Sequence, residues 1–111
     1  MTNRRRVDPR DLSPRDARDR YLRRRRTDST EQSISGWYYR LKLFVEWAEE
    51  QGIKDMAAVD GWTVDEYELH RRSKEVAAST LHNEIKTLRR WLMYLAQIGV
   101  VDRDVAEGIE I

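Results

Sequence analysis

The stretch that decides the fold is residues 79–95, which read STLHNEIKTLRRWLMYL. Apolar residues recur here at steps of three and four, which places on one face of a helix Leu81, Ile85, Leu88, Leu92 and Leu95. The other side carries Ser79, Asn83, Lys86, Arg89 and Arg90, with His82 at its edge. The apolar face predicts a helix packed on a core, over residues 79–98, and Gly99 is its expected stop. The polar face is either an ordinary solvated surface or a binding surface, because hydroxyl, amide and guanidinium groups also bind a phosphate backbone.

A second long amphipathic helix is predicted over residues 29–51. Ser29 and Gln32 have the spacing of a capping box, and Gly52 is a natural C-terminal stop. The apolar positions follow the helical period and form a wide face, the strongest core signal in the chain: Ile34, Trp37, Tyr38, Leu41, Phe44, Val45 and Ala48. The first turns of this helix also carry polar side chains, namely Thr30, Ser33 and Arg40.

Shorter helices are predicted around these two. Ser13 is the expected cap of a helix that begins at Pro14 and runs to about Arg26. Its apolar face is thin, so we expect it to dock loosely or on another molecule. Three further segments are expected to be helical, namely a turn within residues 55–61, a short helix opened by the Thr63–Glu66 capping box with Trp62 facing inward, and a turn within residues 102–111. Four or five helices with short connections predict an all-α fold, an orthogonal bundle.

The composition of the 111 residues indicates one domain with charge divided along the chain. Residues 1–28 hold eleven Arg and five Asp, whereas residues 29–111 hold ten basic and fifteen acidic residues. A basic arm ahead of an acidic body differs from the uniformly basic surface of a simple nucleic-acid binder. Many acids and little Lys fit a salt-loving, high-GC source. There is no cysteine, and no apolar run approaches the ~18 residues of a membrane span, so we expect a soluble, cytoplasmic protein.

No catalytic motif is found in the sequence. His70 and His82 are the only histidines, and neither has metal-ligand spacing to another His or to Cys. A nucleophile motif and a Gly-rich phosphate loop are also absent. We therefore expect no self-contained active site, no metal, no cofactor and no small-molecule substrate. The run Arg23–Arg26 has two interpretations, a phosphate-binding or localisation tract, and cations that offset a helix dipole while they remain in water.

Three segments, in order, resemble one known domain. Residues 30–52, with the pattern T..S...WYYRLKLFVEWAEEQG, look like the first long helix of the core-binding domain of tyrosine recombinases, the phage-integrase family. Ser79-Thr80 followed by LRRWLMYLAQIGVV resembles the last long helix of that domain, and LSPRDARDRYLRRRR resembles its first helix. The resemblance covers about residues 12–105. It implies a SAM-like helical domain that clamps one face of a recombination half-site in double-stranded DNA.

The resemblance also implies a set of DNA-binding residues on the two long helices. One helix would present Thr30, Ser33, Trp37 and Arg40, and the other would present Ser79, Asn83, Lys86, Arg89 and Arg90. Most would contact phosphates, and base edges would be reached by Arg40, Asn83, Lys86 and Arg90. The expected organisation is a flexible arm over residues 1–12, the helical domain over 13–105, and the start of a linker over 106–111.

The resemblance assigns catalysis to a separate domain that follows this linker. The catalytic set of the family is an Arg, a Lys, a His-x-x-Arg pair and a nucleophilic Tyr, and neither His70 nor His82 is followed by Arg three residues later. The expected function is therefore a DNA-binding module that does not cut DNA by itself. The alternative is a helical protein–protein interaction domain, which self-associates through the first helix (residues 13–26) or binds the catalytic domain. A small transcriptional regulator ranks last, because a short helix separates the two long ones.

Overall fold

All regular structure in the described residues is helical. The computed structural model describes residues 11–110, so most of the predicted arm, residues 1–10, lies outside the described residues. The helices are α1 (Pro14–Arg25), α2 (Glu31–Glu50), a 3₁₀ turn η2 (Met56–Ala58), α3 (Gly61–Arg72), α4 (Ala78–Gln97) and α5 (Arg103–Glu107). Residues 11–110 contain no strand. The predicted all-α fold with four or five helices is confirmed.

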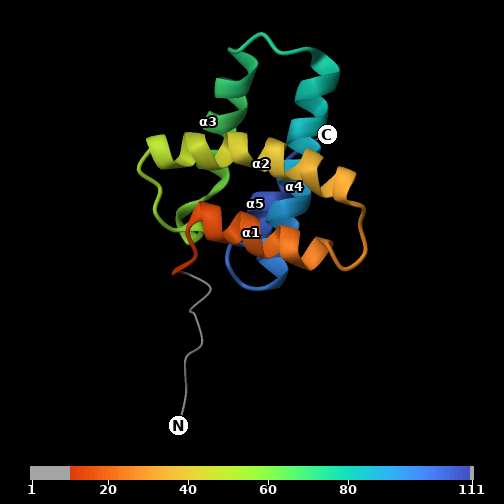
Figure 1. Ribbon diagram of the computed structural model, residues 1–111. Coiled ribbons are helices and arrows are strands. Elements are labelled where there is room, and N and C mark those ends of the chain that lie inside the picture. The colour runs from red at the N-terminus through yellow and green to blue at the C-terminus, as the bar shows by residue number, and fades with distance from the viewer. Residues whose placement is uncertain (1–10, 111) are drawn as a thin grey trace.

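The two long helices cross at the centre of the molecule (Figure 1). In this view α2 lies across α4, α1 runs below α2, and α3 and the first turns of α4 project above it. α1 contacts both α2 and α4, while α3 and α5 contact α4 and each other. α4 is therefore the helix on which all the others meet. None of the described helices is long and apolar enough to cross a membrane.

Aromatic side chains from three helices form the centre of the core. Phe44 of α2 contacts Tyr67 of α3 and Trp91 of α4 edge-on, with ring centroids 5.0 and 5.5 Å apart. Trp47 of α2 also packs on Tyr67, at 5.2 Å. Edge-to-face contacts of this kind are favourable beyond the area they bury. Most of the apolar residues predicted for both long helices are buried here, which fixes the direction in which their polar faces point, although Tyr38 of α2 is 42% exposed.

The first helix docks more firmly than its thin apolar face predicts. Ala17, Tyr21 and Leu22 are all buried, and the indole Nε1 of Trp91 donates a hydrogen bond to the Ala17 carbonyl at 3.3 Å. Because alanine is small, the α1 backbone comes close enough to α4 for this bond. The prediction of loose docking was therefore wrong: one face of α1 is buried against α2 and α4.

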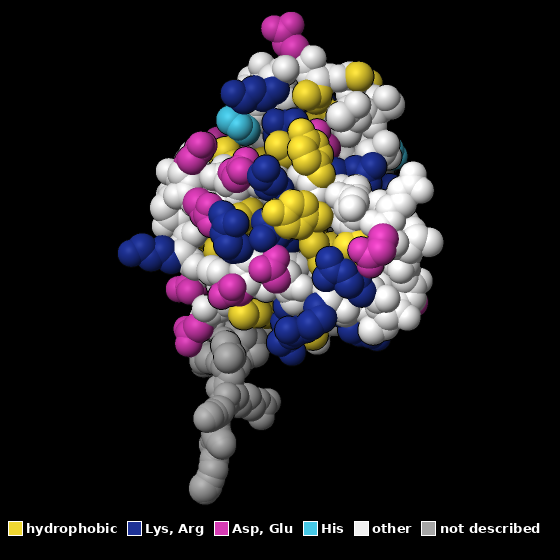
Figure 2. All heavy atoms as spheres, viewed as in Figure 1, with side chains coloured by type: hydrophobic (Ala, Val, Ile, Leu, Met, Phe, Trp, Pro, Cys, Tyr) yellow, Lys and Arg dark blue, Asp and Glu magenta, His cyan; other side chains and the backbone are white. Residues whose placement is uncertain are grey.

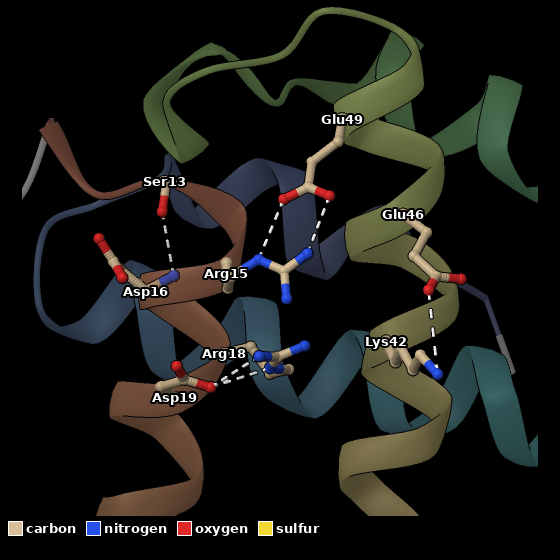
Figure 3. A network of polar contacts seen from close by, with 8 residues as sticks. All are labelled: Ser13, Arg15, Asp16, Arg18, Asp19, Lys42, Glu46 and Glu49. Carbon is tan, nitrogen blue, oxygen red and sulfur yellow. Dashed lines mark hydrogen bonds and ion pairs between the residues drawn. The ribbon is translucent and has the colours of Figure 1, made fainter.

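Two arginines of α1 also contribute to this docking (Figure 3). Arg15 donates to both carboxylate oxygens of Glu49 on α2, at 3.2 and 3.0 Å. Arg18 is only 4% exposed; it pairs with Asp19 and its guanidinium lies over the Tyr38 ring, 4.6 Å from the centroid. Two of the arginines of α1 therefore make contacts within the fold.

The start of each helix tests the predicted caps. Ser13 caps α1 as predicted, accepting from the Asp16 N–H at 3.0 Å. α2 is capped by Thr30, one residue later than predicted, because the Ser29 hydroxyl donates instead to the Asp28 carboxylate. α4 begins at Ala78, one residue before the predicted start, and its N-cap Ala77 offers no side-chain cap.

α3 begins earlier than the predicted capping box at Thr63. Its cap is Asp60, whose carboxylate accepts from the Thr63 N–H at 2.9 Å, and Thr63 is the reciprocal partner within the first turn. This earlier start turns Trp62 outward, where it is 75% exposed. The expectation that Trp62 faces the core was wrong.

The helix ends agree with the predicted glycine stops. Gly52 and Gly99 have φ values of +80° and +83°, a conformation that favours glycine and ends a helix. The last turn, α5, packs on α4 through buried residues, among them Ala106. Ile109 is also buried, so the packed body continues past the expected limit at residue 105. A linker and a catalytic domain after it stay predictions.

Candidate nucleic-acid interface

The polar residues predicted on α4 share one exposed face. Ser79, Asn83, Lys86 and Arg90 are all exposed at steps of three and four, opposite the buried apolar side of the helix. Arg89, the fifth predicted residue of this helix, lies at the margin of the face and is half-buried. The face therefore combines hydroxyl, amide, ammonium and guanidinium donors along about three turns. Such donors dominate contacts to phosphate and sugar in protein–DNA interfaces.

The predicted residues of α2 lie at its first turns, with their donors partly engaged. The Thr30 hydroxyl donates to Ser33 Oγ at 3.1 Å, and both side chains are exposed. Trp37, one turn further, is half-buried and is covered by the Arg25 guanidinium, whose Cζ lies 5.0 Å from the ring centroid. Trp37 is therefore shared between the core and the surface.

Arg40 joins the polar sides of the two long helices. Its Nη1 donates to Thr87 Oγ1 of α4 at 3.4 Å, and Thr87 in turn donates to the Asn83 carbonyl at 2.9 Å. Thr87 follows Asn83 by one turn, so the guanidinium of Arg40 lies beside the exposed face of α4. Residues from both helices thus meet at this junction. Base contacts by Arg40 stay a prediction, since its guanidinium is directed at Thr87 here.

Two arginines outside the predicted set lie next to this face. Arg24 and Arg25, in the last turn of α1, share a surface hollow of about 510 Å³ with Arg89 and Arg90 of α4. The remaining residues that line the hollow are Tyr21, Asp28, Met93, Tyr94, Gln97 and Ile98. The sequence identified the Arg23–Arg26 run, but it held no signal that two of its members meet residues more than sixty positions later.

The surface charge is mixed over α1 and α2, which contrasts with the charge in this hollow. Figure 2 shows blue and magenta side chains interspersed over α1 and α2, consistent with pairs such as Lys42–Glu46 and Arg15–Glu49. In the hollow, four arginines face one carboxylate, that of Asp28. Burial raises the pKa of Tyr21, against the opposing effect of Arg25 and Arg90, so its hydroxyl stays protonated at neutral pH. Among residues 11–110 no group of carboxylates and histidines could hold a metal ion.

Comparisons with known proteins agree on one family. The model of the phage integrase N-terminal SAM-like domain matches residues 16–99. The crystal structure of the N-terminal domain of a phage integrase/site-specific recombinase from Haloarcula marismortui is 53% identical, with a TM-score of 0.87. That match covers 90% of this chain and 96% of the Haloarcula chain. A comparison with curated proteins gave no match.

Proposed function

Because the chain belongs to the family of phage integrase N-terminal SAM-like domains, we propose that it is the DNA-binding module of a site-specific tyrosine recombinase. In this role it clamps one face of a recombination half-site in double-stranded DNA. Strand cleavage is assigned to a separate catalytic domain, so this module binds without cutting. The observation that carries the proposal is the exposed polar face of α4 beside the Arg40 junction.

The chemistry of this face suits a duplex. Lys86 and Arg90 supply cationic donors one turn apart, and Asn83 supplies an amide that can both donate and accept. An α-helix fits the major groove, where such side chains read base edges while neighbouring hydroxyls contact phosphates. The buried side of α4 meets all the other helices, so the exposed face is presented by the most firmly held element of the fold.

The direct test is fluorescence anisotropy with a labelled duplex of ~25 base pairs across a salt series. Lys86→Ala/Arg90→Ala is compared with Lys42→Ala/Lys54→Ala, which removes the same charge from residues outside the face. Each lost phosphate contact should make the dependence of log K on log salt shallower by about 0.9. We expect weaker binding and a shallower slope for the first variant, and nearly normal binding for the second. If both variants lose the same affinity for DNA, the α4 face is an ordinary solvated surface and does not bind the duplex.

The expected affinity of the module is modest. It supplies half of a clamp and carries an acidic body, so we expect dissociation constants near the ~10⁻⁴ to 10⁻⁶ M of non-specific complexes. The titration therefore begins at low salt and uses protein at high micromolar concentration. Binding much tighter than this range would mean that the module alone recognises a specific site.

A second candidate function, protein–protein interaction, is favoured by one observation. Trp62 and Leu69 of α3 are 75% and 57% exposed, and they flank a hollow of about 630 Å³ that also reaches Trp47. The apolar residues of α1 are buried, so α1 is less suited to this role than the sequence suggested. Sedimentation of wild type and Trp62→Ser tests it: an assembly that this variant abolishes, with DNA binding intact, favours the interaction role.

A further inference from the structure

We propose that the last turn of α1 and the second half of α4 form a binding pocket for a DNA backbone phosphate, with Arg24, Arg25, Arg89 and Arg90 as its cations. This inference rests on the proposed function and extends the interface to a third helix. The pocket is the hollow of about 510 Å³ described above. Its floor is aromatic and apolar, through Tyr21, Tyr94 and Met93.

Arg25 is the side chain that marks the pocket as a binding site. Its Nε is buried and has no hydrogen-bond acceptor within the described part of the chain. The guanidinium is nevertheless held in place, because it stacks on Trp37 and its Nη2 lies 4.0 Å from the Asp28 carboxylate. Buried donors in native proteins are almost always satisfied, so an unused, well-positioned N–H group calls for an acceptor that the chain does not supply.

The charge of the pocket favours an anionic acceptor. Arg15 and Arg18 of α1, and Arg26 directly after it, pair with carboxylates of the fold, although Nη1 of Arg18 is also buried without an acceptor. Arg89 and Arg90 have no carboxylate within ion-pair distance among residues 11–110. Uncompensated positive charge is therefore concentrated where the two helices meet. Guanidinium groups bind phosphate oxygens in a bidentate manner, which makes phosphate the matching anion.

The position of the pocket identifies DNA as the source of that phosphate. Arg90 belongs both to the pocket and to the exposed face of α4, one turn beyond Lys86. Trp37, which Arg25 covers, precedes Arg40 by three positions in α2, and residues at this spacing are neighbours on a helix surface. A nucleic-acid strand on the α4 face therefore passes the mouth of the pocket. Free inorganic phosphate shares the chemistry, and the experiment separates the two sources.

The test compares two double variants of the same helix. Arg24→Ala/Arg25→Ala removes two pocket cations, whereas Arg20→Ala/Arg23→Ala removes two exposed arginines that do not line the pocket. Both change the net charge equally. In anisotropy titrations with duplex DNA we expect the pocket variant to bind roughly tenfold more weakly, with a salt slope shallower by about 1 to 2. The control should stay within about twofold of wild type. If both double variants lose the same affinity for DNA, the arginines act only through long-range attraction, and the proposal of a phosphate pocket is wrong.

Further measurements make the outcome unambiguous. Arg25 stacks on Trp37, so thermal unfolding of each variant is recorded, and the single Arg24→Ala variant, whose side chain is exposed, repeats the test without that contact. The Nε–H resonance of Arg25 is then followed by NMR during titration with inorganic phosphate and, separately, with the duplex. Saturation by inorganic phosphate with no response to DNA would overturn a DNA site.

Failure of the pocket can be told apart from failure of the proposed function. Lys86 lies on the α4 face and does not line the pocket, so Lys86→Ala tests the face alone. If Lys86→Ala weakens DNA binding and Arg24→Ala/Arg25→Ala does not, the pocket is wrong and the α4 interface stands. If wild type does not bind duplex DNA at all, both are wrong.

Discussion

Two arginine–glutamate pairs in this molecule have nearly the same geometry and very different surroundings. Arg15 of α1 donates hydrogen bonds to the Glu49 carboxylate of α2 through Nε and Nη2, at 3.2 and 3.0 Å (Figure 3). Arg71 of α3 donates hydrogen bonds to the Glu84 carboxylate of α4 through the same two atoms, at 2.8 and 3.0 Å. The side chains of the first pair are 52% and 44% exposed, and those of the second are 12% and 6% exposed.

Because the geometry is nearly the same, we expect the difference in exposure to water to set how much each pair contributes to the stability of the fold. Between exposed groups the attraction is weakened by the high dielectric of water and by salt, and fixing two side chains costs entropy. In a buried pair the attraction is stronger, but each partner has lost its hydration and depends on the other. The hydrogen bond to Glu84 raises the pKa of Arg71, and the hydrogen bond to Glu49 raises the pKa of Arg15 in the same direction, so burial and not the pKa distinguishes the two pairs. The buried pair also holds the first half of α4, which has no side-chain cap.

The largest expected effect is that of Glu84→Ala. It leaves Arg71 as an unpaired, largely buried cation, and changes of this kind cost about 3–5 kcal/mol of unfolding free energy. Urea unfolding followed by circular dichroism measures this directly. Because Glu84 adjoins Asn83 on α4, we also expect the first turns of α4 to fray and hydrogen exchange to accelerate there.

A paired replacement shows whether the cost comes from the orphaned charge. In Arg71→Met/Glu84→Leu no charge remains, so unfolding free energy should stay within about 1 kcal/mol of wild type or rise above it. A double variant as unstable as Glu84→Ala would mean that α3 and α4 depend on the ion pair itself, and the argument from burial would fail.

A smaller effect is expected for Asp60→Ala, an exposed carboxylate held by backbone donors. The Thr63 N–H bond lowers the pKa of Asp60, so its stabilising contribution is present above its ordinary pKa. That contribution is lost as the pH falls through the lowered value. The difference in Tm between variant and wild type should therefore be constant at neutral pH and begin to shrink as the pH drops below about 4. Once the carboxylate is protonated, only the part of the difference that a neutral cap supplies should remain.

Asp60→Asn is the matched control, since asparagine caps a helix nearly as well without a charge. It should keep most of the stability at neutral pH and show little of the pH dependence. A Tm difference for Asp60→Ala that persists unchanged into strong acid would show that the carboxylate charge is not what stabilises the cap.

The smallest effect is expected for Glu49→Ala. It removes the partner of Arg15 by the same substitution and with the same change in net charge as Glu84→Ala. Arg15 stays hydrated, so the change in urea midpoint should be close to zero and should disappear at 1 M salt, where screening is complete within a few ångströms. A destabilisation as large as that of Glu84→Ala would break the comparison.

Much of the fold could be predicted from local sequence signals. The apolar periods of the two long helices, the Ser13 cap and the Gly52 and Gly99 stops all depend on residues close together in the chain. The errors arose where two nearby residues could serve one purpose. Thr30 caps α2 although Ser29 is equally suited, because Asp28 engages Ser29. At α3 the predicted capping box was Thr63–Glu66, whereas the capping box in the structure is formed by Asp60 and Thr63.

The candidate site was predictable only in part. The exposure of Ser79, Asn83, Lys86 and Arg90 follows from helical periodicity, since one side of α4 had to be buried. Contacts between helices have no such local signal. The Arg40–Thr87 bond spans 47 positions, and the meeting of Arg25 with Arg90 depends on how α1 packs. The thin apolar face of α1 predicted loose docking. The sequence holds no signal for the hydrogen bond that the Ala17 carbonyl accepts from Trp91.

That last bond also has a consequence for synthesis on the ribosome. Trp91 follows Ala17 by 74 residues, and at roughly 5–20 residues per second it is made about 4–15 seconds later. Throughout that interval the arginine-rich first helix has been translated without α4, one of the two helices that bury its apolar side. The domain therefore completes its core late, and during that interval the arginine-rich first helix can pack only on α2.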